Sequence, residues 1–190
     1  MQLFILIGPS AAGKTTVMEA LLADPTLNLV RFLTTTSRDP RKGEIPGVQY
    51  QFVSPAQFQL MIKAGTFFEW TEIYGHLYGT NKETLNALRR GARPIVCVLE
   101  PQGAQKIKQV DPEQTTLIAI DAPRKTLLAR LQARHTDPED VAKRIARIDS
   151  EMRLYPKLAD VCITNKEGEL AKTVEEVKQL ILKTCVFRLF

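Results

Sequence analysis

The residues with the clearest chemical potential are Gly8, Gly13, Lys14 and Thr15, in the stretch ILIGPSAAGKTT (residues 5–16). Glycine, four residues, then Gly-Lys-Thr after an apolar run is typical of a loop whose backbone N–H groups surround a phosphate. The helix expected behind it adds a favourable dipole. The lysine can reach β- and γ-phosphates, and the threonine hydroxyl can bind Mg²⁺. The expected phosphate loop comprises Gly8, Pro9, Ser10, Ala11, Ala12, Gly13, Lys14, Thr15 and Thr16.

The alternative is an ordinary strand–turn–helix that contains these residues by coincidence. The apolar run before the motif, the helical pattern behind it and its place in an alternating chain all match the context that a phosphate loop requires. The stretch therefore predicts binding of a nucleoside triphosphate, and leaves the acceptor open.

A second cluster lies in TTTSRDPRKGEIPGVQY, where Arg38, Arg41 and Lys42 follow a run of hydroxyl residues and precede Tyr50. Guanidinium groups donate bidentately to phosphate, so this cluster suits a phosphate monoester. A solvated basic loop is the alternative. Further along, Glu69 stands between aromatic residues. A carboxylate there can accept hydrogen bonds from the N1–H and exocyclic amine of guanine, which adenine does not offer in the same place.

Composition limits the remaining choices. The chain has 190 residues, a net charge of +5, 44% hydrophobic residues and no apolar run near the ~20 residues of a membrane span. The positive charge fits nucleic acid or a polyphosphate substrate equally. The three cysteines form no CxxC pair, which favours a reducing, cytoplasmic setting, and Cys97 and Cys162 are expected in the core.

The elements that must position these groups alternate between strand and helix, the pattern of a parallel sheet covered by helices. Strands are expected at 3–7, 30–35, 94–100, 115–121 and 160–164, and helices at 14–23, 82–90, 101–110, 123–134, 137–155 and 170–184. Between residues 35 and 80, Pro and Gly punctuation and short aromatic runs predict an inserted lobe of antiparallel strands with a helix at 55–65.

Together these motifs resemble the guanylate kinases, from GPSAAGKTT to VCITN. The stretch TTTSRDPRKGEIPGVQYQFVS is the most specific part, and FFEWTEIYGHLYGT and QGAQ are next. The resemblance implies one α/β domain over 1–190, with a three-layer P-loop core at 1–33, 81–128 and 155–190. It also implies a mixed α/β GMP-binding lobe at 34–80 and a helical lid at about 129–154. It implies ATP-dependent phosphorylation of GMP or dGMP, with ATP and Mg²⁺ and without nucleic acid or membrane partners. A homodimer is possible.

The same resemblance implies roles for single residues. Those that would hold the GMP phosphate are Arg38, Arg41, Tyr50 and Tyr78, and those that would contact guanine are Thr34, Glu69, Thr80 and Glu100. The lid arginines that could reach phosphates are Arg130, Arg134, Arg144 and Arg147, of which the resemblance favours Arg134 and Arg144. The expected catalytic set is Lys14, Arg38, Arg134 and Arg144, with Thr15 as the metal ligand.

One departure concerns the metal. Where the family usually has Asp-x-Asp, this chain has Val98 and Glu100, which a strand would place on one face. The lost carboxylate favours one alternative, a catalytically weakened module that binds phosphorylated protein segments. The intact phosphate loop opposes it. A second alternative is a related P-loop kinase with another acceptor, such as a ribose bisphosphate, which the Arg38 and Glu69 segments oppose.

Overall fold

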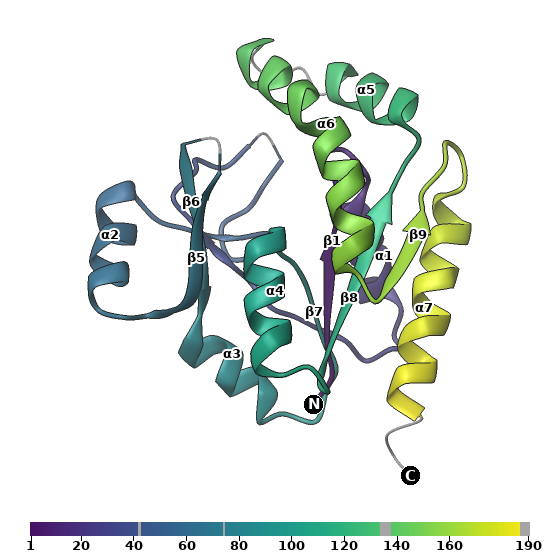
Figure 1. Ribbon diagram of the computed structural model, residues 1–190. Helices are drawn as coiled ribbons and strands as arrows, with labels where there is room; N and C mark the ends of the chain where they lie inside the picture. The colour runs from purple at the N-terminus through teal and green to yellow at the C-terminus, as the bar shows by residue number, and fades with distance from the viewer. Residues whose placement is uncertain (42, 74, 134–137, 187–190) are drawn as a thin grey trace.

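A parallel five-stranded sheet forms the centre of the computed structural model, which describes residues 1–41, 43–73, 75–133 and 138–186. Its strand order is β2-β7-β1-β8-β9 (Figure 1). The strands are β1 (Leu3–Ile7), β2 (Val30–Arg31), β7 (Ile95–Val98), β8 (Thr115–Asp121) and β9 (Val161–Thr164). The helices around it are α1 (Lys14–Ala23), α3 (Lys82–Arg89), α4 (Pro101–Val110), α5 (Arg124–Ala133), α6 (Pro138–Leu158) and α7 (Leu170–Val186).

Helices cover both faces of this sheet because both faces of its central strand are apolar. All five residues of β1 are fully buried, and successive side chains point to opposite faces. Phe4 and Leu6 pack with α1 and α7, whereas Leu3, Ile5 and Ile7 pack with α4. The result is the expected three-layer α/β architecture, which is confirmed.

A separate lobe follows β2, and its sheet has the order β4-β3-β6-β5. Its elements are β3 (Thr35–Thr36), β4 (Gln51–Phe52), α2 (Pro55–Lys63), β5 (Phe67–Ile73) and β6 (His76–Asn81). The β3–β4 pair is parallel, and β6 pairs antiparallel with both β3 and β5. Phe58 of α2 stacks on Phe67 of β5, with ring centroids 4.4 Å apart, and forms the lobe's own small core. This lobe lies to one side of the main sheet (Figure 1).

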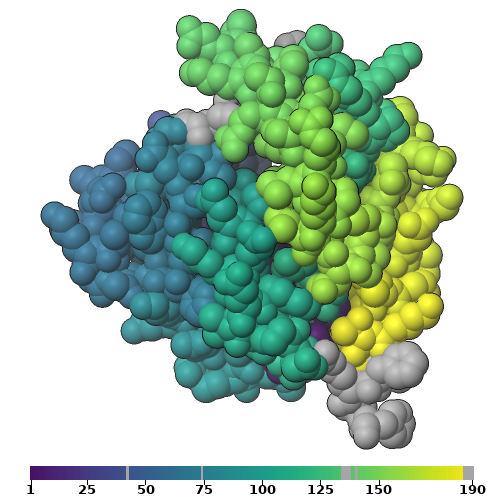
Figure 2. All heavy atoms as spheres, in the orientation of Figure 1, coloured from purple at the N-terminus to yellow at the C-terminus, as the bar shows by residue number. Residues whose placement is uncertain are grey.

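Helices α5 and α6 rise beyond the carboxyl ends of the central strands (Figure 1). The lobe and α6 stand on either side of a recess at the upper edge of the molecule in Figure 2, where the lobe is blue and α6 is green. Substrates of open α/β sheets bind at this edge. The architecture therefore directs attention to the recess.

Three expectations from the sequence were wrong. The lobe was expected to consist of antiparallel strands, but β3 and β4 pair in parallel because the chain returns between them instead of turning in a hairpin. The strand expected at 30–35 is divided, because β2 pairs with β7 in the main sheet whereas β3 pairs with β6 in the lobe. Cys97 is buried as expected, but Cys162 is exposed. Cys162 lies on β9, at the edge of the sheet, where only one neighbouring strand is present and alternate side chains face outward.

No helix among the described residues is long and apolar enough to cross a membrane.

Candidate active site

The loop between β1 and α1 has the conformation that a phosphate cradle needs. Gly8 and Gly13 have φ angles of 143° and 98°, and Ala11 has a φ of 67°. A Cβ at Gly8 would lie 2.0 Å from the carbonyl oxygen of Ile120, so only glycine fits there. Gly8 is thus required where the end of β1 approaches β8, and Gly13 suits a left-handed backbone position of the loop. Ala11 takes up the other left-handed position.

Lys14 begins α1 and folds back over this loop. Its Nζ donates hydrogen bonds to the carbonyl oxygens of Gly8, at 2.7 Å, and Pro9, at 2.9 Å. The ammonium group is therefore already fixed beside the loop, on the cavity that the loop borders. A positive charge held in advance beside a phosphate site is already near its target, and Nζ has only to exchange these two carbonyl oxygens for phosphate oxygens when the anion arrives.

The cavity has a volume of about 230 Å³ and joins elements from the whole chain. Most residues expected from the sequence line it, from the phosphate loop, the lobe and the lid: Gly8, Ser10, Ala11, Gly13, Lys14, Thr15, Thr16, Arg38, Arg41, Tyr50, Tyr78, Glu100 and Arg144. Pro9 and Ala12 turn their carbonyl groups to Lys14 and Asn165 instead. Arg134 lies outside the described residues.

The lobe side of the cavity is strongly basic. The Arg38 guanidinium pairs with Glu44 at 2.9 Å and lies 5.6 Å from the ring centroid of Tyr50. Glu44 also accepts a hydrogen bond from the backbone N–H of Arg41, at 2.7 Å. One carboxylate thus holds the Arg38 guanidinium and the backbone of Arg41. Glu44 was missed at the level of sequence, although its position three residues after Arg41 is what such a turn requires.

Two pKa shifts describe this basic region. Burial, followed by the charges of Arg38 and Arg144, lowers the pKa of Arg41. Burial raises the pKa of Tyr50 to about 12, so its hydroxyl keeps its proton and can donate. A dianionic phosphate would relieve the repulsion among the three arginines and accept from Tyr50.

Glu69 lies in a smaller pocket of about 20 Å³ that adjoins the cavity and is also lined by Thr34, Tyr78 and Glu100. Its side chain is 6% exposed, and it accepts a hydrogen bond from the Thr80 hydroxyl at 2.6 Å. Burial raises the pKa of its carboxyl, and the bond from Thr80 opposes this shift. A buried carboxylate with one remaining acceptor edge is suited to a partner that brings two donors.

Val98 and Glu100 both line the cavity and the smaller pocket. Val98 ends β7, and Glu100 lies just before α4. Burial raises the pKa of Glu100, and the nearby charge of Lys14 opposes the rise. Glu100 is therefore a buried acid whose carboxyl is influenced by the charge of the phosphate-loop lysine, and Val98, on the same cavity, offers only methyl groups.

Helix α6, in the segment expected to form a lid, contacts the phosphate loop directly. Arg144 Nη1 donates to the Ser10 hydroxyl at 3.2 Å, and the backbone N–H of Ser10 donates to Glu151 Oε2 at 3.3 Å. Arg147 also lines the cavity, whereas Arg130 lies 3.5 Å from the carbonyl oxygens of Ala11 and Ala12. Glu151 was missed from the sequence, where it is one acid in a mixed-charge helix. Its spacing of seven residues from Arg144 places both on one face of that helix.

Comparison with known proteins identifies relatives along nearly the whole chain. A sequence model of the family described as guanylate kinase matches residues 1–184. The guanylate kinase of Idiomarina loihiensis is 34% identical over 177 residues, which cover 92% of this chain and 84% of that protein. The guanylate kinase of Thermosynechococcus vestitus is 35% identical over 189 residues, which cover 98% of this chain and 93% of that protein.

Solved structures agree on the fold. The crystal structure of guanylate kinase from Anaplasma phagocytophilum matches with a TM-score of 0.74 at 23% identity, and the match covers 96% of this chain and 85% of that one. Shikimate kinase from Acinetobacter baumannii matches with a TM-score of 0.51 at 17% identity, over 96% and 94% of the two chains.

Proposed function

The chain belongs to the guanylate kinase family, and from this premise we propose that ATP transfers its γ-phosphoryl group to GMP, or dGMP, inside the cavity described above. The products are ADP and GDP. One observation carries the proposal: a single cavity is bordered both by the phosphate loop and by Arg38, Arg41 and Tyr78. Donor and acceptor phosphates would therefore meet between two sets of fixed positive groups.

The phosphate loop would hold ATP. Its backbone N–H groups and the dipole of α1 favour the triphosphate, and Lys14 would leave the carbonyls of Gly8 and Pro9 for the β- and γ-phosphates. The residues present fit Mg²⁺, which prefers one or two protein oxygens together with substrate phosphates and water. The Thr15 hydroxyl and the Glu100 carboxylate line the cavity beside Lys14 and would hold it. When bound, the ion neutralises charge on the phosphates.

The lobe would hold GMP. Its phosphate would bind to Arg38, Arg41, Tyr50 and Tyr78, whose positive or donor groups face the cavity. Guanine would enter the adjoining pocket, where Glu69 accepts from N1–H and the exocyclic amine. We also assign guanine binding to Thr34, Thr80 and Glu100. The Thr80 hydroxyl acts by holding Glu69 Oε1 at 2.6 Å.

The lid would complete the site. Arg144 and Arg147 line the cavity from α6 and can approach the phosphoryl group in transfer, where negative charge is spread over its oxygens. We also assign Arg134 to this group. Closure of the lid would exclude water, so that GMP and not water accepts the phosphoryl group.

These contacts support the division of the chain that we propose: a core of 1–33, 81–128 and 155–190, a GMP-binding lobe of 34–80 and a lid of about 129–154. The free thiols of Cys97, Cys162 and Cys185 support a cytoplasmic setting. We propose neither a nucleic acid nor a membrane as partner, because the arginines of the site converge on the cavity. A homodimer stays a prediction.

The proposal is tested by following ADP and GDP after mixing the protein with ATP, GMP and Mg²⁺. Wild type should form both products in equal amounts. Lys14→Ala should slow transfer by ~100-fold or more, since one preorganised charge is worth about 3 kcal/mol of barrier, while its melting temperature stays unchanged. Lys172→Ala, on the exposed face of α7, is the matched control and should be fully active. Activity of Lys14→Ala within about twofold of wild type would refute the assignment.

A further inference from the structure

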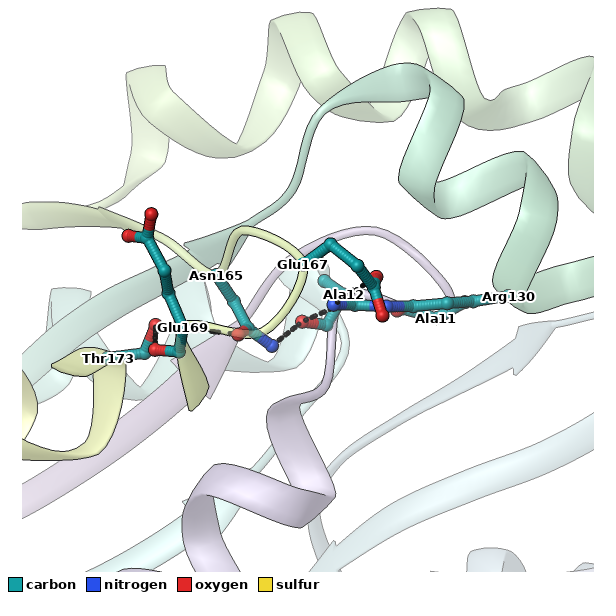
Figure 3. A network of polar contacts seen from close by, with 7 residues as sticks. All are labelled: Ala11, Ala12, Arg130, Asn165, Glu167, Glu169 and Thr173. Carbon is teal, nitrogen blue, oxygen red and sulfur yellow. Dashed lines mark hydrogen bonds and ion pairs between the residues drawn. The ribbon is translucent and has the colours of Figure 1, made fainter. Parts of the chain in front are cut away.

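A network of polar contacts lies behind the phosphate loop, on the segment between β9 and α7 (Figure 3). Its centre is Asn165, whose side chain is 3% exposed. Asn165 Nδ2 donates to the carbonyl oxygen of Ala12 at 2.8 Å, and its backbone N–H donates to the carbonyl oxygen of Asp121 at 2.7 Å. The side chain that contacts the loop is thus fixed to the carboxyl end of β8.

The orientation of the Asn165 amide follows from its partners. The carbonyl oxygen of Ala12 can only accept, so the NH₂ group must face it. The amide oxygen then faces the Thr173 hydroxyl, at 3.4 Å; this hydroxyl also lies 3.2 Å from the carbonyl oxygen of Glu169. Arg130 approaches the same stretch of loop and pairs with Glu167 at 3.2 Å.

This contact determines where a phosphate-loop donor points. A peptide unit is planar and trans, so its C=O and N–H groups point in opposite directions. With the carbonyl of Ala12 held by Asn165, the N–H of Gly13 points away from Asn165. Gly13 itself lines the cavity. The same hydrogen bond therefore fixes one side of this peptide and, through its planarity, the direction of the N–H on the other side.

Gly13 is needed for this contact as well as for its φ of 98°. A Cβ at Gly13 would lie 2.4 Å from Asn165 Nδ2, so a larger residue would push the amide off the loop. The second glycine of the motif and Asn165 therefore form one unit, although they lie far apart in the sequence.

We propose that Asn165 is a positioning residue for ATP: it fixes the Ala12–Gly13 peptide before the nucleotide arrives, so that the Gly13 N–H faces the triphosphate. Thr173 supports it by holding the amide oxygen. The proposal rests on the proposed function for its ligand, whereas the orientation of the peptide is a property of the protein alone. Loss of the contact should raise the Kd and KM for ATP about tenfold and leave those for GMP unchanged.

The test uses protein labelled with ¹³C at alanine carbonyls and ¹⁵N at glycine amides. Only two Ala-Gly pairs occur in the sequence, at 12–13 and 64–65, so a carbonyl-to-amide correlation spectrum contains two signals. Gly65, whose N–H donates to Ile62 at the end of α2, is the internal control. In Asn165→Leu, which removes the donor without adding charge, the Ala12 carbonyl signal should move in the absence of nucleotide, while the control signal stays in place.

Titration calorimetry supplies the second readout. Asn165→Leu should bind ATP about tenfold more weakly and GMP as wild type does. Thr173→Val should weaken ATP binding a few-fold and Thr173→Ser should restore it, which keeps the test decisive if Asn165→Leu does not fold. An unmoved Ala12 signal, unchanged ATP affinity in both variants or equal losses for ATP and GMP would each overturn the proposal. A wild-type Gly13 signal that ignores ATP would contradict the proposed function instead.

Discussion

The carboxylate of Glu69 lies directly against the α-carbon of Gly103. A methyl group at Gly103 would lie 2.6 Å from Glu69 Cδ and 2.7 Å from each carboxylate oxygen. Glu69 belongs to the lobe and Gly103 to α4 of the core, so the proposed base-recognition group is held by a helix outside its own lobe. Gly103, in the segment QGAQ at 102–105, therefore supports the proposed guanine pocket through Glu69, without itself lining that pocket.

Gly103→Ala should displace Glu69 and weaken guanosine binding about tenfold or more, because the carboxylate cannot keep its place beside a new methyl group. Titration calorimetry with guanosine and with inorganic phosphate separates the two halves of the acceptor site, and phosphate affinity should not change. In a Glu69→Gln background the same substitution should have little further effect. Equal losses in both backgrounds would show that Gly103 acts on something other than Glu69.

The raised pKa of Glu69 predicts how stability depends on pH. Burial raises this pKa above its ordinary value of 4.5, so the folded state binds the proton more tightly than the unfolded state. The stability that protonated Glu69 contributes is fully present below pH 4.5, and it is lost as the pH rises through the raised pKa of the folded state. Ligand-free Glu69→Gln should therefore melt above wild type at about pH 7, and the gap should close near pH 4. A gap that widens toward low pH would contradict this account.

The contact between Glu151 and the phosphate loop predicts that this carboxylate competes with ATP for the loop. Its carboxylate accepts from the Ser10 N–H, a donor that ATP needs. Glu151→Gln should therefore bind ATP about fivefold more tightly, because the amide oxygen is a weaker acceptor than the carboxylate and carries no negative charge to repel the phosphates, a difference of ~1 kcal/mol. Glu72→Gln, at another acid on the same cavity, is the matched control and should change ATP affinity by less than twofold. Weaker ATP binding by Glu151→Gln would show that the carboxylate assists the nucleotide.

Val98 predicts an altered need for Mg²⁺. If no other acid replaces the missing carboxylate, Val98→Asp should raise turnover or lower the Mg²⁺ requirement by one to two factors of ten, at ~1.4 kcal/mol each. Glu100 lies beside Lys14 on the same cavity and can take this place. Initial rates against Mg²⁺ concentration for both proteins decide between these accounts. A wild type that is fast at low Mg²⁺, and is not improved by the substitution, would assign the metal to Glu100.

Local patterns predicted much of the fold. The bounds of α1 at 14–23, α4 at 101–110 and β8 at 115–121 agree with the apolar periods and caps of the sequence. The division at 30–35 could not be predicted, because β2 and β3 are extended alike and differ only in the sheet they join. The exposure of Cys162 likewise depends on strand order, which no local pattern contains.

The residues of the candidate site also fall into two groups, those that the sequence could predict and those that it could not. Residues within short motifs, such as Lys14 and Arg38, could be predicted because their chemistry lies in their spacing. Gly103, Glu151 and Asn165 could not, since each acts through a neighbour that is distant in sequence: Glu69, Ser10 and Ala12. Only packing of the core, lobe and lid brings these partners together.

The central claim is that this cavity transfers phosphate from ATP to a guanine nucleotide chosen by Glu69. It is tested most directly by kcat/KM with ATP and each of GMP, AMP, CMP and UMP, for wild type and Glu69→Gln. We expect wild type to prefer GMP over AMP by ~10³-fold or more, because AMP leaves a buried acceptor unpaired, and Glu69→Gln to lose most of this preference. A wild type that phosphorylates AMP within about tenfold of GMP, or binds GMP without forming GDP, would contradict the account.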